Sequence, residues 1–184
     1  EFVQASVQAA IAHPEVKILN CSLNTSHRYI RTYYARMYEA KFLMGAIAGA
    51  MAENGQLAYI ADYPIFGTIA NINAFALGAK MVNPRAQIYL EWSTLKDVDL
   101  GIAMDNVIKK GVTVVSGRDM VIPEDASRYF GLYHIEKEGP RNLAMPLWHW
   151  GKFYEQLIRT IMDGTWKYDD NKDETKAINY WWGL

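Results

Sequence analysis

The residues best suited to chemistry follow the predicted strands of this sequence. We predict strands near 57–61, 88–92, 112–115 and 129–133, because each is a short apolar run bounded by polar or turn residues. In open α/β sheets, ligands bind at the carboxyl ends of strands. Aromatic rings stack on flat or sugar-like ligands, and a few fixed polar groups select among them. The candidates in these loops are Asp62, Tyr63, Phe66, Trp92, Ser93, Asp97, Arg118, Asp119, Tyr133 and Trp148.

These residues favour a cleft for a small molecule. The competing interpretation is that most of the rings merely cover the ends of the core. The corner at Tyr63-Pro64 carries an aromatic ring and a proline where a phosphate-binding loop would carry glycines. No G-x-G-x-x-G follows a predicted strand and no P-loop is present, which argues against a nucleotide phosphate as the ligand.

Catalytic and metal-binding patterns are weak. The four histidines lack metal-ligand spacing, and we predict neither a metal nor another cofactor. Ser116, His134 and Asp119 could form a hydrolase triad, but no G-x-S-x-G elbow supports it. Cys21 lies in a predicted strand, where an inert apolar role is favoured. We therefore predict a protein that is not an enzyme, with a Ser/His/Asp hydrolase as a less favoured alternative.

Composition narrows the classes of partner. The chain has 184 residues, of which 51% are apolar, and a formal net charge of -1. Without a basic block, nucleic acid and a purely electrostatic membrane partner are not expected. The longest apolar run, residues 42–52, is shorter than the ~20 residues that span a bilayer. The chain starts within a predicted helix and ends on "NYWWGL", so we expect it to be part of a longer protein.

Hydrophobic periodicity predicts alternating strands and helices. Helices are expected at residues 2–12, 33–53, 64–83, 98–110 and 147–162, and "NYWW" predicts a final strand. Small residues from Gly45 to Ala50 form one face of the second helix, which we expect to pack closely on a sheet. The segment "EKEGPRN" is expected to be a polar link. This alternation predicts an α/β protein with a doubly wound parallel sheet.

Four stretches resemble the basic membrane protein (BMP) family of ABC-transporter solute-binding proteins, which is also called the purine nucleoside receptor-like family. The most specific is "NINAFALGAKMVNPRAQIYLEW". The others are "TYYARMYEAKFLMGAIAGAMAENGQLAYIADYPIFG", "PLWHWGKFYEQLIRTIMDGTWK" and "SVQAAIAHPEVKI". The resemblance covers nearly the whole chain.

The resemblance implies a type I periplasmic-binding-protein fold, with two α/β lobes and a ligand between them. Residues 1–30 would end the first lobe and enter the hinge, and 31–140 would form the second lobe. Residues 141–184 would form the return hinge, a late first-lobe helix and a tail. The implied function is capture of a purine nucleoside or nucleobase in the interlobe cleft. The implied setting is extracytoplasmic, with a lipoprotein anchor in the plasma membrane and delivery to the membrane subunits of an ABC transporter.

The sequence departs from the family at its ligand positions. The ring that stacks on the base corresponds to Leu95, the ribose-binding Asp corresponds to Tyr133, and a Lys of nucleoside-binding members corresponds to Trp148. Asp97 and Asp119 match polar positions of the same loops. These departures leave open the ligand-sensing domain of a membrane-tethered or transcriptional regulator, which would use the same cleft with another output.

The late helix raises a question of assembly. Its apolar residues include Leu147, Trp150, Tyr154 and Ile158, which in the family pack on the first lobe. We expect this helix either to pair with the helix beginning at Phe2 and with the strand "VKIL", or to be covered by a second copy of the chain.

Overall fold

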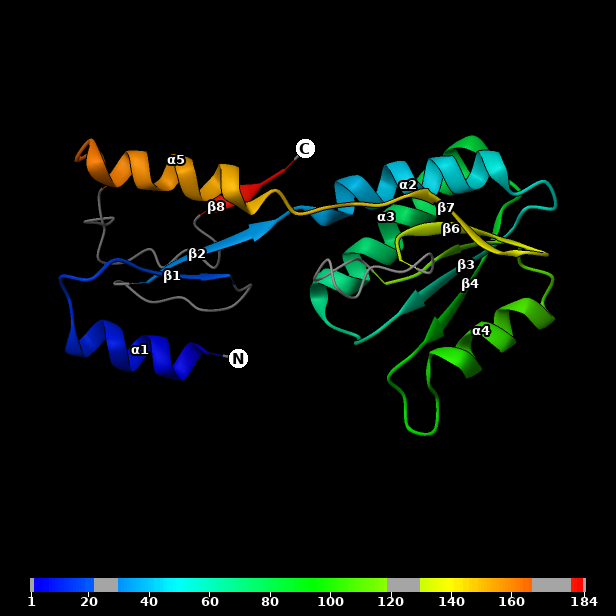
Figure 1. Cartoon of the computed structure of the whole chain (residues 1–184), viewed down its shortest axis with the longest axis horizontal. Coiled ribbons are helices and arrows are strands. Elements are labelled where there is room, and N and C mark those ends of the chain that lie inside the picture. Colours follow the sequence, from blue (N-terminus) through cyan, green and yellow to red (C-terminus); the bar gives the residue numbers. More distant parts are fainter. Residues whose placement is uncertain (1, 22–29, 119–129, 167–179, 184) are drawn as a thin grey trace. The chain divides into compact units, whose positions relative to one another are not determined.

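The computed structural model describes residues 2–21, 30–118, 130–166 and 180–183, apart from the side chain of Phe66. The chain divides into two compact units (Figure 1). Unit 1 comprises Glu1–Arg36 and Trp148–Leu184, and unit 2 comprises Met37–Leu147. The boundaries that we expected were 30/31 and 140/141, each six or seven residues earlier in the chain. The assignment of the units to a first and a second lobe stays a prediction.

Unit 1 is built on three parallel strands. β1 (Ile18–Cys21) pairs with β2 (Ile30–Ala35), and β2 pairs with β8 (Tyr180–Trp182). The helices α1 (Val3–Ala12) and α5 (Trp150–Met162) lie on opposite faces of this sheet (Figure 1). The predicted terminal strand and both predicted helices of this unit are therefore confirmed.

Aromatic packing attaches α5 to the unit 1 sheet. The Tyr33 ring of β2 stacks on Phe153 with 4.9 Å between centroids, and its hydroxyl oxygen lies 2.8 Å from that of Tyr154. Phe153 also meets Trp182 of β8 edge-on at 5.7 Å. Burial, together with the hydrogen bond to Tyr154, raises the pKa of Tyr33 above its ordinary value. Because α1 lies on the other face of the sheet, the first expected arrangement, a pairing of α1 with α5, is wrong, and cover of these helices by a second copy of the chain stays a prediction.

Unit 2 contains a five-stranded sheet in the order β4-β3-β5-β6-β7. Its strands are β3 (Gln56–Ala61), β4 (Gln87–Trp92), β5 (Val114–Ser116), β6 (Leu132–Glu136) and β7 (Gly139–Ala144). The first three in the spatial order are parallel, as predicted, but β6 is antiparallel to β5. The α/β class is confirmed, whereas the prediction of a single parallel sheet is wrong.

The antiparallel return has a physical reason. A parallel connection needs a crossover, usually a helix, and the strand–helix alternation of the sequence stops after Ser116. Backbone pairing instead continues beyond β5. Gly117 N–H donates to the Gly131 carbonyl, and Gly131 N–H donates to the Arg118 carbonyl, both at 2.8 Å. Gly131 has a φ of 65°, which glycine adopts without strain.

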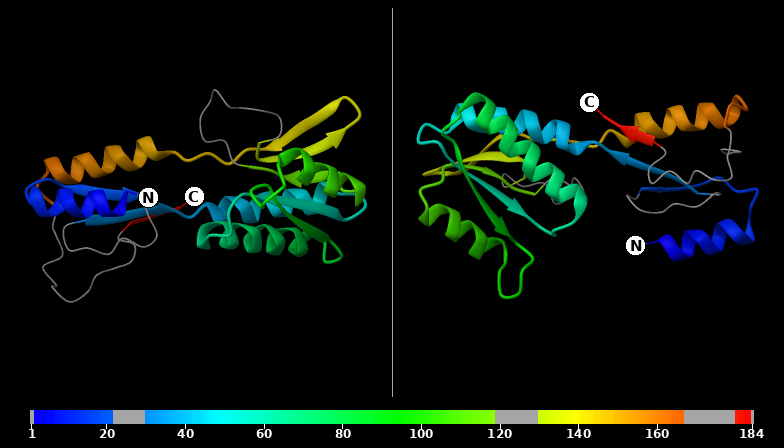
Figure 2. Two further views of the ribbon diagram at one scale, coloured as in Figure 1. Left: turned by 90° about the horizontal axis from the view of Figure 1, so that it is seen from below. Right: turned by 180° about the vertical axis from the view of Figure 1, so that it is seen from behind.

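Helices cover both faces of the unit 2 sheet. The pair α2 (Met37–Met51) and α3 (Phe66–Val82) lies on one face, and α4 (Leu100–Lys109) lies on the other (Figures 1 and 2). Each face has its own core, one including Leu57, Phe75 and Val114, and the other including Ile60 and Val107. We expected the long helix to begin at residue 33, but it begins at Met37. Residues 33–35 belong to β2, because the run "IRTYYA" is rich in strand-forming residues and is mostly buried.

The helices α2 and α3 approach each other backbone to backbone. A Cβ atom on Gly45 would lie 2.0 Å from the Phe75 carbonyl oxygen, and one on Gly78 would lie 2.0 Å from the Phe42 carbonyl oxygen. A Cβ on Gly49 would lie 2.6 Å from the Ala79 carbonyl oxygen. The glycines of the small-residue face of α2 therefore pack on α3 and not on the sheet, and Ala50 of the same face is exposed, which corrects our expectation.

The strands β6 and β7 form an edge hairpin where we expected a polar link. Pro140 is tolerated because β7 lies at the sheet edge, where a missing N–H breaks no ladder. Glu136, at the end of β6, accepts a hydrogen bond from Arg141 Nε at 2.5 Å. This bond holds the pKa of the Glu136 carboxyl below its ordinary value.

Replacing Gly45 or Gly78 with alanine should destabilise unit 2. The new methyl group meets a carbonyl oxygen at 2.0 Å, so the helices must separate. We expect the free energy of unfolding to fall by roughly 1–3 kcal/mol in urea denaturation followed by circular dichroism. Gly151→Ala in α5 is the matched control, since its Cβ would meet nothing within 4 Å. An equal response of the control and the two variants would contradict the packing described.

The Glu136 carboxyl should titrate below 4.5 in the folded protein when followed by NMR. A depressed pKa means that the ion pair contributes stability above the unfolded pKa, and that this contribution is lost as the pH falls through the folded pKa. The loss is therefore confined to the acid side of pH 4.5. Arg141→Gln should raise the Glu136 pKa, whereas Arg85→Gln should not. Identical titrations in the two variants would show that Arg141 is not the cause.

Candidate functional site

The candidate site lies at the carboxyl ends of β3 and β4, and it is named here the β3–β4 crevice after the rule that places ligands at such strand ends. The chain leaves β3 for α3 on one face of the sheet and leaves β4 for α4 on the other (Figure 1). Neighbouring loops that turn to opposite faces leave room at the strand ends, where ligands bind in open α/β sheets. This is the edge at which the sequence predicted a site.

Asp62 connects the two loops of this crevice. Ser93 Oγ donates a hydrogen bond to Asp62 Oδ1 at 2.7 Å and lies 3.3 Å from the Ala61 carbonyl oxygen. The Thr94 hydroxyl donates to the Asp62 carbonyl oxygen. Within the described part of the chain, Asp62 Oδ2 accepts no hydrogen bond. The carboxylate is thus oriented by one oxygen and retains the other as an acceptor.

The apolar candidates differ in how far they are exposed. Tyr63 is 62% exposed beside Asp62, and Leu95 is 52% exposed in the loop after β4. Trp92 is half-buried and packs against the core on the α2–α3 side. Phe66 is the first residue of α3, and its side chain lies outside the described set. Tyr63 is therefore the ring most available for stacking.

Backbone geometry shapes the loop after β4. Asp97 is exposed and has a φ of 64°, the left-handed region that only a few non-glycine residues adopt. Asp99 then caps α4, because its Oδ1 accepts from the Ile102 N–H at 2.8 Å. The loop thus holds Ser93 and Thr94 near Asp62 and leaves Asp97 in solvent.

Other predicted residues are not brought to this crevice. Tyr133 is fully buried among the residues of the α4-side core, where its hydroxyl donates to Met104 Sδ at 3.0 Å. Arg118 is exposed with its guanidinium 5.8 Å from the centre of the Phe130 ring, and Asp119 lies outside the described residues. Trp148 belongs to unit 1.

The hydrolase alternative lacks its central contact. Ser116 pairs with Leu132 and His134 pairs with Val114, so serine and histidine are offset by two residues along neighbouring strands. Neither Ser116 Oγ nor His134 Nδ1 has a hydrogen-bond partner within the described residues, although Nδ1 lies 3.5 Å from Glu136 Oε1. A nucleophile needs a base within hydrogen-bonding reach.

The described residues carry neither a metal-binding cluster nor a membrane-spanning helix. Three or more histidine, cysteine, aspartate or glutamate side chains do not gather in a metal-binding arrangement there. The helices in the same ranges are too short or too polar to cross a bilayer.

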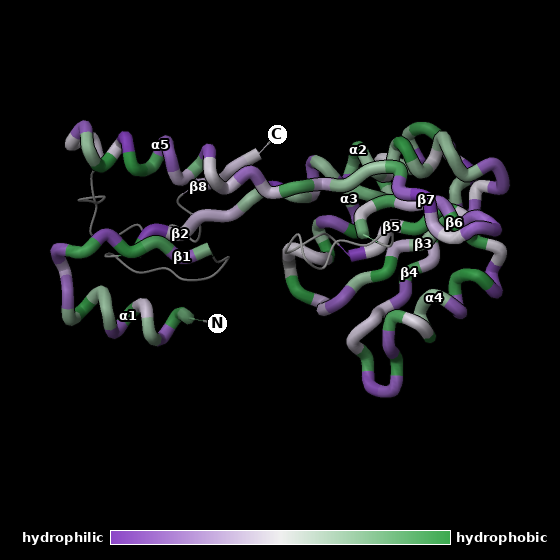
Figure 3. The backbone as a smooth tube through the Cα atoms, in the orientation of Figure 1, coloured by the Kyte–Doolittle hydropathy of each residue, from purple (hydrophilic) through white to green (hydrophobic). Residues whose placement is uncertain are grey.

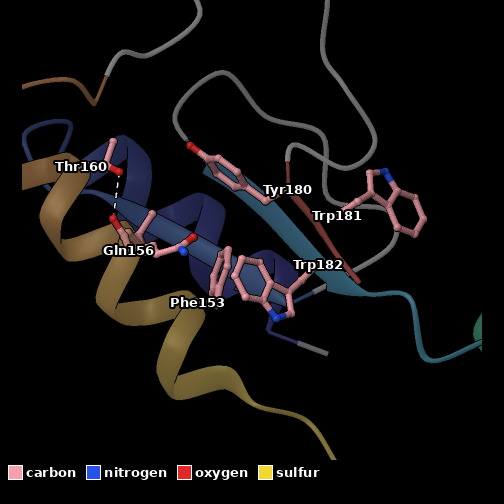
Figure 4. A pocket seen from close by; sticks show the side chains of 7 residues that line it. Phe153, Gln156, Thr160, Tyr180, Trp181 and Trp182 are labelled. Atoms are coloured by element: carbon pink, nitrogen blue, oxygen red, sulfur yellow. Dashed lines mark hydrogen bonds between the residues drawn. The ribbon is translucent and has the colours of Figure 1, made fainter. Parts of the chain in front are cut away.

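Sequence reasoning missed a pocket in unit 1. It has a volume of about 400 Å³ and lies between α5 and β8. Figure 4 shows the Phe153 and Trp182 rings beside each other in its wall, with Thr160 donating a hydrogen bond to the Gln156 carbonyl. The aromatic run "NYWW" next to an amphipathic helix was the signal that could have found it. Its walls are Phe153, Gln156, Leu157, Thr160, Tyr180, Trp181 and Trp182.

Comparison with known proteins gave three kinds of match. The family model described as PnrA-like ABC transporter substrate-binding protein matches residues 2–123. A purine-binding protein of Brucella abortus is 26% identical over 196 residues, covering 100% of this chain and 53% of that protein. A putative ABC transporter glucose-binding protein of Haloferax volcanii is 29% identical over 147 residues, covering 74% of this chain and 38% of that protein.

A solved structure shares the fold. The transcriptional activator of the comK gene from Bacillus halodurans superposes with a TM-score of 0.61 at 12% identity, over 99% of this chain and 64% of that chain. This chain thus spans about half the length of its curated relatives, or less. The family match covers more than half of the chain and confirms the resemblance seen in the sequence. The chain belongs to the PnrA-like (Bmp) family of ABC transporter substrate-binding proteins.

Proposed function

We propose that the protein captures a purine nucleoside or nucleobase in the interlobe cleft of this family, with the β3–β4 crevice of unit 2 as one wall. The observation that carries the proposal is the Asp62 carboxylate, which Ser93 orients through one oxygen while the other remains an acceptor. Capture requires an oriented acceptor and a ring, and no reacting group. The whole protein then delivers its ligand to the membrane subunits of a transporter from an extracytoplasmic, lipid-anchored position.

Purines suit the chemistry of this edge. Their ring N–H groups and exocyclic amine, or the hydroxyls of a ribose, can donate to Asp62 Oδ2. The exposed Tyr63 ring can stack on the base. The first backbone N–H groups of α3 are uncapped by any described side chain and can donate to base acceptors. A relative named as a purine-binding protein supports this class of ligand.

A sugar is the second candidate for the same site. Aromatic rings and carboxylates also bind hydroxyl-rich ligands, and the second relative is named as a putative glucose-binding protein. The two classes differ in what Tyr63 contributes, because a base presents a π face to the ring and a hexose presents C–H bonds. Direct comparison of purines with glucose separates them.

Isothermal titration of the protein with adenosine, guanosine and free purine bases should give binding in the micromolar range, and glucose should give weaker binding. Leu95 cannot stack on a base as an aromatic ring does, and this makes the binding free energy of a base less favourable by ~1–3 kcal/mol. The Tyr133 hydroxyl is engaged with Met104 in the core and offers no carboxylate to a ribose. Nanomolar binding of a nucleoside would contradict this argument, and binding of glucose without any purine would replace the proposed ligand.

Asp62→Asn should weaken the purine affinity by roughly 10- to 100-fold, since a hydrogen bond to a charged group contributes about 1.5–3 kcal/mol. Asparagine keeps an oxygen for Ser93, so the loops should stay in place and the thermal unfolding midpoint should change little. Asp105→Asn on the exposed side of α4 is the matched control. Equal affinities in the two variants would remove Asp62 from the site.

A further inference from the structure

We propose that the outward surface of α2 and α3 is a contact between two copies of this chain, related by a twofold axis. The surface, named here the helix-pair patch, combines large exposed side chains with small ones between them. Leu43 is 53% exposed, Leu77 65% and Met81 63%. The patch consists of Leu43, Ala46, Ile47, Ala50 and Met51 from α2 and Leu77 and Met81 from α3.

Helical spacing makes the patch continuous. Leu43, Ile47 and Met51 are separated by four residues each, as are Leu77 and Met81, so each set forms a row along its helix. The two helices touch through Gly45, Gly49 and Gly78, which brings the Ala46–Ala50 row of α2 next to the Leu77–Met81 row of α3. The Leu43 row lies on the far side of these alanines, away from the glycines. Figure 3 shows that apolar residues predominate in α2 and α3. Helices that are apolar all round are normally covered on all sides.

The exposed area matches what a dimer needs. From the exposed fractions, the five large side chains of the patch present roughly 500 Å² of apolar surface, toward the upper end of the roughly 300–600 Å² of the largest patch on a typical monomer. A standard protein interface buries about 800 Å² on each partner. The patch therefore supplies most of one side of such an interface without any contribution from the rest of the chain.

The shape of the patch favours a second copy over other occupants. The large side chains of Leu77 and Met81 adjoin a shallow row at Ala46 and Ala50. A twofold axis places the large residues of each copy against the small row of the other, so one surface supplies both halves of the contact. Among the described exposed residues of the two helices, Lys80 is the only charged one, which disfavours an anionic membrane surface.

Sedimentation velocity over a concentration series tests the proposal. The protein should be a dimer at micromolar concentration, and Leu43→Glu or Leu77→Glu should raise the dimer dissociation constant at least ~100-fold by burying a charge. Two matched controls carry the same substitution elsewhere, Ile108→Glu on α4 and Ile158→Glu on α5, which are 48% and 55% exposed. Both controls should remain dimeric, and circular dichroism should show all four variants folded.

A crosslink tests the twofold arrangement separately. Mixing an Ala50→Cys variant with a Met81→Cys variant, each in a Cys21→Ser background, should give an intermolecular disulfide under mild oxidation, because the arrangement places each of these residues against the other in the partner copy. Mixing Ala50→Cys with Ile108→Cys in the same background should not. The proposal is overturned if the protein is still monomeric at concentrations 100-fold above the micromolar range. It is also overturned if the dimer persists in the Leu77→Glu variant, or if only Ile158→Glu disrupts the dimer. The last outcome would assign the contact to α5.

Discussion

The close approach of α2 to α3 is the constraint on which unit 2 depends. Without a Cβ at Gly45, Gly49 and Gly78, the two backbones meet directly, and both helices can lie over the same face of the sheet. Met44 and Ala48 from one helix and Phe75 and Ala79 from the other then share a single core layer. Because α3 starts just after β3, the same contact also determines where the loop around Asp62 must run.

The candidate site follows from that arrangement. With α2 and α3 filling one face, the connection from β4 must use the other face for α4, and the two loops separate at the strand ends. The Asp62–Ser93 hydrogen bond spans the separation. Such a site holds a polar acceptor in place, as the proposed capture of a ligand requires, and the chain belongs to a substrate-binding family.

Local patterns in the sequence predicted most elements but not how every pair of them meets. The apolar strands β3, β4 and β5 and the helices α1, α4 and α5 were predicted because periodicity reports which side of an element is covered. Hydrophobic periodicity carries no information on the direction of a strand, so β6 was predicted to be parallel. It also misses a short edge strand that contains proline, as in β7. At the candidate site, Asp62 and Ser93 were predicted from their place after strands, and the structure joins them by a hydrogen bond. The core position of Tyr133 depends on Met104, which lies 29 residues earlier.

Apolar periodicity does not say whether a face is covered by its own chain or by another. In α5 the chain itself covers the side of the helix that carries Phe153, which stacks on Tyr33 of β2, whereas Ile158 is 55% exposed. In α2 and α3 no polar face develops. The rows containing Met44 and Phe75 are buried on the sheet, the glycine rows are buried between the helices, and a third row around Leu43 and Leu77 is still apolar. That third row contributes little to the folding of unit 2 itself, and the contact between two copies proposed above accounts for its composition.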